Sequence, residues 1–336
     1  MHYVWFLVLG LCTIFTGCLI DYGGSPLENI TTIHWNSDGS MVLAIREKPF
    51  DSVGYTHYQY YLDAYDRSGK EISSTRIDRE SVQPKGYLQP KAITTDGHHI
   101  VFSNTNTFTL MFGNITDSAL VFVDGSDVDA ISPSGQVMLS HSLNIPADGK
   151  NITYFLTSFV SGQSRQIRQW KSRLANDQPE PVILTDSIFS IAENISGNDF
   201  FSVYDTSLNL IYQEPMPYGG MLGIGYAPSI HSILAVTNWD SPTYLNGNVE
   251  LIDSVGKSKH VLDWPGSMNA APDGFHVVFS GTGFTVRNLL TNNEKTITTE
   301  TGIWQCFSPD AQIVALVSSS TTASTTVRCV GVNGLP

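Results

Sequence analysis

The chain has 336 residues, a formal net charge of −13 and a charged fraction of only 15%. A chain this acidic lacks the basic footprint on which nucleic-acid binding depends, so we predict no nucleic-acid partner. The same charge argues against attachment to anionic lipids by charge alone. Many Ser, Thr, Gly and Asn residues beside few charged ones are typical of exported β proteins.

The amino terminus has the features of a targeting signal. Residues 4–17 are apolar or small, a run that is short for a membrane span but fits the core of a signal peptide. It ends in Phe-Thr-Gly-Cys at residues 15–18, which resembles the bacterial lipobox. The resemblance implies a signal peptide over residues 1–17 and a lipid on Cys18, the first residue of the mature protein.

The residues after Cys18 bear on where the protein is held. Leu19, and not Asp, follows the cysteine, which in lipoproteins of this kind implies sorting to the outer membrane. We therefore expect a lipid anchor in the bacterial outer membrane, and a secreted chain is the alternative. Residues 18–29 contain Gly, Ser and Pro, as a flexible tether does. Alternatively, they form a closing strand beside the last repeat unit, because an open sheet edge invites aggregation.

From residue 30 onward, a polar turn followed by a short apolar run recurs. The clearest copy is Phe-Ser-Pro-Asp-Ala-Gln-Ile-Val-Ala-Leu at residues 307–316. One residue just after the turn aspartate, or its equivalent, marks each copy: Gly39, Gly97, Gly135, Gly197, Ile230, Gly274 and Ala311. Four copies keep the aspartate itself: Asp38, Asp96, Asp273 and Asp310. The mean spacing of about 45 residues is the period of a four-stranded propeller blade.

Both parts of the repeat have a structural reason. Asp-Gly makes a tight reversal because Asp bonds its own backbone and Gly adopts a positive φ without strain. The β-branched apolar run behind it is typical of a strand buried on both faces. The repeat resembles those of WD-repeat and TolB-like β-propellers, and the missing Trp-Asp dipeptide favours the TolB-like kind.

We therefore predict an all-β fold, with a single β-propeller of about seven four-stranded blades over residues 30–336. Six or eight blades also fit the spacing, and a tandem of β-sandwiches is the alternative architecture.

One short segment departs from the acidic composition. Four basic side chains surround a tryptophan there: Arg165, Arg168, Trp170, Lys171 and Arg173. Arg and Trp are favoured at protein interfaces, so this segment is the predicted partner-contacting patch, and a solvated strand or loop face is the alternative. The overlapping segment Gln163–Ala175 is the best helical candidate in a chain with little helical periodicity.

Two cysteines remain beyond the signal segment and Cys18. In the predicted strand order, Cys306 lies on the inner strand of the last blade and Cys329 on its third strand. Their Cα atoms would then be roughly 9 to 10 Å apart, beyond the reach of a disulfide. We predict two buried free thiols.

The sequence contains no motif that carries a familiar chemistry. It has no Gly-X-Ser-X-Gly, no His-X-X-X-His and no Cys-X-X-Cys. Asp124, Asp127 and Asp129 resemble a loose calcium loop, but the distant Glu that completes such a loop is missing, and a solvated turn is the simpler interpretation. We predict neither a metal nor a cofactor.

These observations favour a non-enzymatic, lipid-anchored propeller that binds or scaffolds other proteins of the bacterial envelope. There are two alternatives. One is a propeller enzyme, lactonase-like or glycosidase-like, with a site at the channel mouth. The other is a secreted recognition glycoprotein.

Overall fold

The structure is a computed structural model. It describes residues 28–332 except 53–54, 83–84, 105, 108, 116–119, 133–134, 145–149, 160–162, 173–181, 184, 186, 196–197, 216–219, 228–231, 240–246, 254–256, 264–267, 274, 281–282, 299–301 and 321–322. The predicted signal segment, Cys18 and the predicted tether up to residue 27 lie outside the described residues. All regular secondary structure within the described residues is β-strand.

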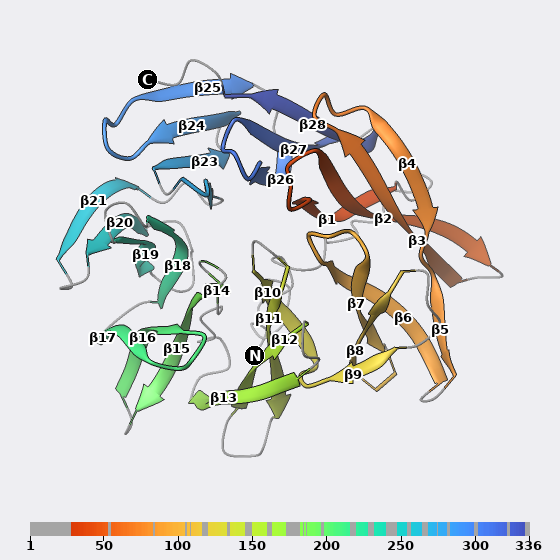
Figure 1. Ribbon diagram of the computed structural model, residues 1–336, viewed down its shortest axis with the longest axis horizontal. Coiled ribbons are helices and arrows are strands. Elements are labelled where there is room, and N and C mark those ends of the chain that lie inside the picture. Colours follow the sequence, from red (N-terminus) through yellow and green to blue (C-terminus); the bar gives the residue numbers. More distant parts are fainter. Residues whose placement is uncertain are drawn as a thin grey trace, which may run out of the picture.

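Seven antiparallel sheets lie side by side around a central axis, so the chain is a seven-bladed β-propeller (Figure 1). The predicted all-β fold and the predicted blade number are confirmed. The strands of each blade follow one another in the chain. Because every blade is built from consecutive strands, chain order and order around the ring agree.

The blades contain the following strands. Blade 1 has β1 (Asn29–Trp35), β2 (Met41–Ser52), β3 (Tyr55–Asp66) and β4 (Glu71–Arg76). Blade 2 has β5 (Arg79–Val82), β6 (Lys85–Ile93), β7 (His99–Asn104), β8 (Thr109–Asn114) and β9 (Val121–Val123). Blade 3 has β10 (Asp127–Ile131), β11 (Val137–Asn144), β12 (Lys150–Ser158) and β13 (Gln163–Ser172). Blade 4 has β14 (Val182–Ile183), β15 (Ile188–Ile195), β16 (Asn198–Asp205) and β17 (Leu210–Pro215).

Blades 5 to 7 complete the ring. Blade 5 has β18 (Gly220–Ala227), β19 (Ser232–Trp239), β20 (Asn248–Asp253) and β21 (Ser258–Asp263). Blade 6 has β22 (Met268–Ala270), β23 (His276–Ser280), β24 (Phe284–Asn288) and β25 (Glu294–Thr298). Blade 7 has β26 (Gly302–Phe307), β27 (Ile313–Ser320) and β28 (Ala323–Gly331). Within the described residues, blade 7 is the blade with three strands.

The core lies between the blades, and the second strand of blade 1, β2, is apolar on both faces. On β2, Val42 and Ala44 pack against blade 7, whereas Leu43 and Ile45 pack against blade 2. Successive side chains of a strand point to opposite faces, so a strand between two neighbours needs an unbroken apolar run. This is the physical origin of the short apolar runs in the sequence.

The repeated turn joins the first two strands of a blade. In blade 1, Gly39 N donates to Asn36 O at 3.0 Å, and Ser40 N donates to Asp38 Oδ1 at 2.8 Å. The marker residues described in four blades share a left-handed backbone, with φ of 69° at Gly39, 72° at Gly97, 70° at Gly135 and 55° at Ala311. The markers Ile230 and Gly274 fall in gaps of the described chain, in the corresponding turns of blades 5 and 6.

Neighbouring turns touch, which defines two faces of the ring. Ser37 N in the turn of blade 1 donates to Thr95 O in the turn of blade 2, at 3.0 Å. We call this side, where the inner strands end, the turn face. The inner strands begin on the opposite side, which we call the start face.

One marker was placed in the wrong turn. Gly197 falls between β15 and β16, the second and third strands of blade 4. The first turn of that blade lies between β14 and β15, where Thr185 N donates to Ile188 O at 3.1 Å. In this copy β14 has only two residues, and in the sequence Ser187 follows Asp186 where most other copies have Gly.

The helical interpretation of Gln163–Ala175 is also wrong. Gln163–Ser172 forms β13 and pairs with β12 from Ser158↔Gln163 to Lys150↔Ser172. Pairing with a neighbouring strand outweighs weak local helix propensity.

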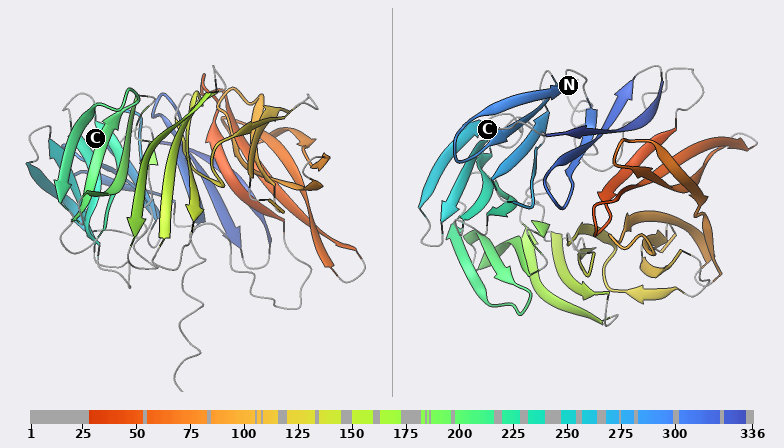
Figure 2. Two further views of the ribbon diagram at one scale, coloured as in Figure 1. Left: turned by 90° about the horizontal axis from the view of Figure 1, so that it is seen from below. Right: turned by 45° about the horizontal axis from the view of Figure 1, so that its top comes forward.

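Two hairpins of blades 1 and 2 continue past their blades on the start face. Within the described residues, β1 pairs with β2 as far as Glu47 and β4 pairs with β3 as far as Tyr61, so residues 48–52 and 55–60 form a two-stranded ribbon. The β5–β6 hairpin adds a fifth strand beside β6. In the side view, the orange β2–β3 ribbon extends beyond the lower rim of the ring (Figure 2). The described residues of these two hairpins, 48–52 with 55–60 and 79–82 with 85–88, are called the hairpin extensions below.

Candidate functional site

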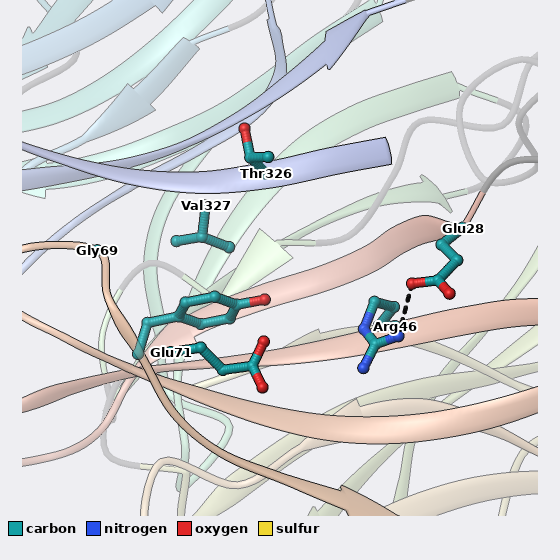
Figure 3. A pocket seen from close by; sticks show the side chains of 7 residues that line it. Glu28, Arg46, Gly69, Glu71, Thr326 and Val327 are labelled. Atoms are coloured by element: carbon teal, nitrogen blue, oxygen red, sulfur yellow. Dashed lines mark hydrogen bonds and ion pairs between the residues drawn. The ribbon is translucent and has the colours of Figure 1, made fainter. Parts of the chain in front are cut away.

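A cleft of about 410 Å³ opens where blade 7 meets blade 1 (Figure 3). Thr326 and Val327 of β28 form one wall, and Arg46 of β2 and Tyr65 of β3 form the other. Three further residues line it: Glu28, Gly69 and Glu71. The cleft therefore lies at the one junction in the ring where the first and last blades come together.

An ion pair organises the blade 1 wall. Arg46 contacts Asp63 through two nitrogens, with Nη2 donating to Oδ1 at 3.1 Å, and Asp63 also accepts a hydrogen bond from Ser74 Oγ at 2.6 Å. The Asp63 side chain is 0% exposed and that of Arg46 is 16% exposed. The hydrogen bond to Asp63 raises the pKa of Arg46, so its charge persists at every accessible pH. The guanidinium also stacks over the ring of Tyr61, 4.8 Å from the centroid.

A second ion pair fastens the residue that precedes β1. Glu28 accepts a hydrogen bond from Arg46 Nη1 at 2.7 Å and lies 2.9 Å from Lys48 Nζ. Burial opposes the negative charge, but contacts with Lys48 and Arg46 outweigh it and lower the pKa of Glu28. Of the two carboxylates that line the cleft, Glu28 is thus already engaged by Arg46 and Lys48.

Blade 3 contains a buried acid and base. Asp129 Oδ1 lies 2.7 Å from His141 Nδ1, and both side chains are largely buried. Burial raises the pKa of Asp129, against the opposing effect of His141. Burial disfavours the charged imidazole too, but the adjacent Asp129 outweighs it and raises the pKa of His141. Asp129 Oδ2 has no hydrogen-bond partner within the described part of the chain.

The three aspartates of the segment that resembles a loose calcium loop make separate contacts. Asp129 faces His141, Asp127 lies 3.5 Å from Lys91, and the backbone carbonyl of Asp124 accepts from Ser140 Oγ at 2.8 Å. Over the described residues, no group of three or more His, Cys, Asp or Glu side chains could hold a metal ion.

The turn aspartates bond within their own turns. The backbone N–H groups of Ser40, His98, Phe275 and Gln312 donate to Oδ1 of Asp38, Asp96, Asp273 and Asp310 respectively. The hydroxyl of Ser308 and the guanidinium of Arg67 lower the pKa of Asp310 to about 2. The described aspartates of the repeat therefore use their carboxylates for hydrogen bonds within the turns that they form.

The predicted partner-contacting patch lies on β13, the outer strand of blade 3. Arg165 donates to the backbone carbonyl of Thr206 in blade 4, so part of this segment joins two blades. By backbone register, Arg168, Trp170 and Lys171 pair with Tyr154, Ile152 and Asn151. Arg173 lies outside the described residues. The role of the patch stays a prediction.

The two cysteines of blade 7 are free thiols, as predicted, but both are partly buried and not fully buried. Cys306 and Cys329 both pair with Ala315, from opposite sides of β27, so a whole strand separates them. The structure contains no helix, within the residues it describes, that is long and apolar enough to cross a membrane.

No protein-family model matches this sequence, and no curated protein matches it either. Solved structures do. An oligogalacturonate lyase in complex with manganese aligns at 11% identity, covering 90% of this chain and 88% of the lyase, with a TM-score of 0.61. The β-propeller domain of the Trilobed protease from Pyrococcus furiosus, described as having an open velcro topology, aligns at 11% identity over 92% of this chain and 96% of that domain, with a TM-score of 0.57. TolB from Acinetobacter baumannii aligns at 12% identity over 88% and 81% of the two chains, with a TM-score of 0.43. The propeller fold is what this chain shares with the lyase and the protease domain.

Proposed function

We propose that this protein is a lipid-anchored β-propeller of the bacterial envelope that binds other proteins through the hairpin extensions on its start face. The observation that carries the proposal is the projection of these extensions beyond the four-stranded part of their blades. An isolated two-stranded ribbon adds little stability to a fold, so its length calls for another role.

Tyrosines give the extensions a chemistry suited to protein contacts. Tyr87 on β6 is 55% exposed, and Tyr58 on β3 is partly exposed. Tyr60 packs against the core between blades 1 and 2 and ties the ribbon to the ring. Tyrosine buries a large rigid surface at a small entropy cost and is enriched at binding hot spots. The lipobox-like residues 15–18 support attachment to the membrane at Cys18.

The proposal is tested by site-specific photo-crosslinking in intact cells of the native host. A photoreactive amino acid at Tyr87 is compared with one at Leu210, which is 51% exposed on the outer strand of blade 4. We expect a discrete protein adduct from position 87 and none from position 210. The Tyr58→Ala/Tyr87→Ala variant should reduce co-purification of the same partner at least tenfold, while Leu210→Ala leaves it unchanged. Adducts only from position 210, or equal adducts from both, would refute the assignment.

A further inference from the structure

Most of the exposed apolar side chains lie at the same end of the outer strands. Within the described residues, the large apolar side chains that are at least 45% exposed are Ile72, Tyr87, Val121, Phe122, Leu210, Ile211 and Leu290. Five of these occupy the first two positions of β4, β9 or β17, and Leu290 lies in the connection from β24 to β25. Single exposed apolar residues are ordinary, but the same position in several blades indicates a contact surface.

The topology places this end of the outer strands on the turn face. The strands of a blade are consecutive and antiparallel, so the connection from the third to the fourth strand returns to the side where the inner strand ends. Arg67 lies in this connection of blade 1 and donates to Gly39 O at 3.0 Å and to Asp310 Oδ2 at 2.8 Å, both in first turns. Figure 1 shows the outer strands β4, β17 and β25 along the margin of the ring. The exposed apolar residues therefore follow the outer edge of the turn face.

Charge sets one part of this face apart. Blades 6, 7, 1 and 2 are consecutive around the ring, and the first turn of each carries an aspartate and no Lys or Arg: Asp273, Asp310, Asp38 and Asp96. We call the turn face of these four blades the acidic sector. Hydrogen bonds from Ser40 lower the pKa of Asp38, so this carboxylate is charged at neutral pH. By contrast, residues 150–176, which include the outer strand of blade 3, carry five basic residues and no acidic one.

The acidic sector has its own apolar edge. Leu290 belongs to blade 6, Ile72 to blade 1, and Val121 and Phe122 to blade 2. Val121 and Phe122 are successive residues of β9, so their side chains point to opposite faces of the strand, and each is 55% exposed. Neither face of β9 is therefore covered at this end, and apolar surface lies beside the charged turns.

The charges decide which partner fits this surface. The aspartates would repel an anionic membrane or a nucleic acid. A second copy that docked through the same sector would bring like charges together, which is costly at an interface. A protein that presents basic and apolar side chains side by side would match both the turns and the edge.

We propose that the acidic sector and its apolar edge form a docking surface for a protein with a basic, partly apolar surface. This surface lies on the opposite face from the hairpin extensions. It therefore goes beyond the partner binding proposed for the start face and does not depend on it. Leu210 and Ile211 of blade 4 lie outside the acidic sector and are not part of the docking surface.

A defined probe tests the chemistry of the docking surface. The probe is a fluorescent peptide of alternating lysine and leucine, and fluorescence anisotropy measures its affinity for the full-length protein in nonionic detergent. Phe122→Ser and Asp38→Asn should each weaken binding roughly fivefold or more, because one removes apolar contact and the other charge. A peptide with glutamate in place of lysine should not bind.

Matched changes in blade 4 are the controls. Leu210→Ser alters a side chain of similar exposure, and Asp205→Asn alters an aspartate that accepts a backbone N–H of its own turn, as Asp38 does. Asparagine can make the same turn contact, so the asparagine variants should fold. Both control variants should bind the lysine peptide as the parent does. Equal losses in the two sets, or equal binding of the glutamate peptide, would overturn the proposal.

Crosslinking in intact cells of the native host tests the docking surface where it works. Photoreactive amino acids at positions 72 and 122 should capture one and the same protein, identified by mass spectrometry as having a net positive charge. Position 87 reports on the start face, so the two surfaces are scored separately. A second copy of this chain, a lipid or an acidic protein captured at position 122 would contradict the proposal, as would the absence of any adduct at both positions.

Discussion

Gly97 and Gly135 have the same backbone conformation but different surroundings. Their φ angles are 72° and 70°. A Cβ atom at Gly97 would lie 3.1 Å from Cδ1 of Leu43, the flexible end of a side chain, whereas at Gly135 it would lie 2.5 Å from the backbone N of Thr95. The turn of blade 2 therefore has room for a side chain at Gly97. The turn of blade 3 has no room at Gly135, because the backbone of Thr95 in the neighbouring turn lies too close.

Alanine substitutions separate the cost of a positive φ, which both positions share, from the cost of the close backbone contact at Gly135. We expect Gly97→Ala to lower the free energy of unfolding by about 1–2 kcal/mol, the cost of a left-handed L residue. Gly135→Ala should lose about 1–3 kcal/mol more, because the backbone of Thr95 must shift. Denaturant unfolding of both variants measures the difference. Equal losses would show that the two turns are not in contact.

Arg46 and Asp63 were not predicted as a site, although the sequence carried a signal. Each is a charged residue inside an apolar strand, in Leu-Ala-Ile-Arg and Tyr-Leu-Asp-Ala. A buried charge needs a partner of opposite sign, so two such residues on neighbouring strands point to a pair. What the sequence could not provide was the register that brings them together.

Removing one member of this pair should be costly. Arg46→Leu leaves the fully buried carboxylate of Asp63 without its cation and should destabilise the protein by about 3–5 kcal/mol. The double variant Arg46→Leu/Asp63→Leu should recover most of that loss. Lys48→Ala removes a half-exposed pair with Glu28 and should cost less than about 1 kcal/mol. Thermal or denaturant unfolding distinguishes the three, and an additive double variant would contradict the pairing.

The Asp129 and His141 pair predicts how stability depends on pH. The pKa of His141 is raised in the folded state, so its contribution is full below the ordinary pKa of about 6.5 and disappears as the pH rises through the raised value. The pKa of Asp129 is raised as well, so the contribution of this carboxyl group to folding stability also decreases as the pH rises, over a lower pH range. We therefore expect the free energy of unfolding to fall between pH 6 and 8.

Asp129→Asn should reverse this dependence. Without the carboxylate, burial becomes the leading influence on His141 and lowers its pKa, although the charge of Asp127 still opposes it. Stability should then rise with pH between about 5 and 7. His260→Asn, at a side chain 53% exposed, should keep the parental slope. An unchanged slope in Asp129→Asn would show that the pair does not govern the titration.

At the scale of strands, inner and second strands were predictable and outer strands were not. β27 and β23 stand between two blades and need apolar side chains on both faces, which leaves a readable run in the sequence. All six residues of β4 are exposed, so no alternation marks it. The best helical candidate, Gln163–Ala175, is a strand over residues 163–172 because cross-strand pairing with β12 decides the conformation.

The predicted strand order of blade 7 leads to a test of its thiols. Burial, aided by the charge of Asp66, raises the pKa of Cys329 to about 11, and burial raises the pKa of Cys306 as well. Thiolates are the reactive species, so both cysteines should be labelled slowly by maleimide in the native protein and rapidly in guanidinium. Intact mass under non-reducing conditions should show no bridge between them. A loss of two hydrogens would mean that the order β26, β27, β28 is wrong.

At the scale of the whole molecule, the mean spacing of the repeats was enough to predict the ring because each blade repeats the same packing problem. Variation in loop length does not disturb that average, so the misplaced Gly197 left the blade number correct. The cleft was not predictable, because it arises where blades distant in sequence meet. The structure shows this junction through the cluster that joins Ile30 and Val42 to Val317 and Val327.

The anchoring prediction also concerns the whole molecule. Cys18→Ser removes the proposed lipid site and should move the protein from the membrane fraction to the soluble fraction, while Cys12→Ser within the signal should leave it in the membrane. Mass spectrometry of the mature amino terminus should find an acylated Cys18. A mature chain that begins elsewhere, with Cys18 unmodified, would favour the secreted alternative.

The ion pairs of Glu28 have a mechanical consequence. A force applied at Glu28 would first load its contacts with Arg46 and Lys48 of β2. The force would then act along β1, parallel to the strand. The hydrogen bonds between β1 and β2, from Asn29↔Glu47 to Trp35↔Val42, would resist it together and would not break one after another. A propeller pulled at Glu28 would therefore resist the force by shear of the β1–β2 strand pair.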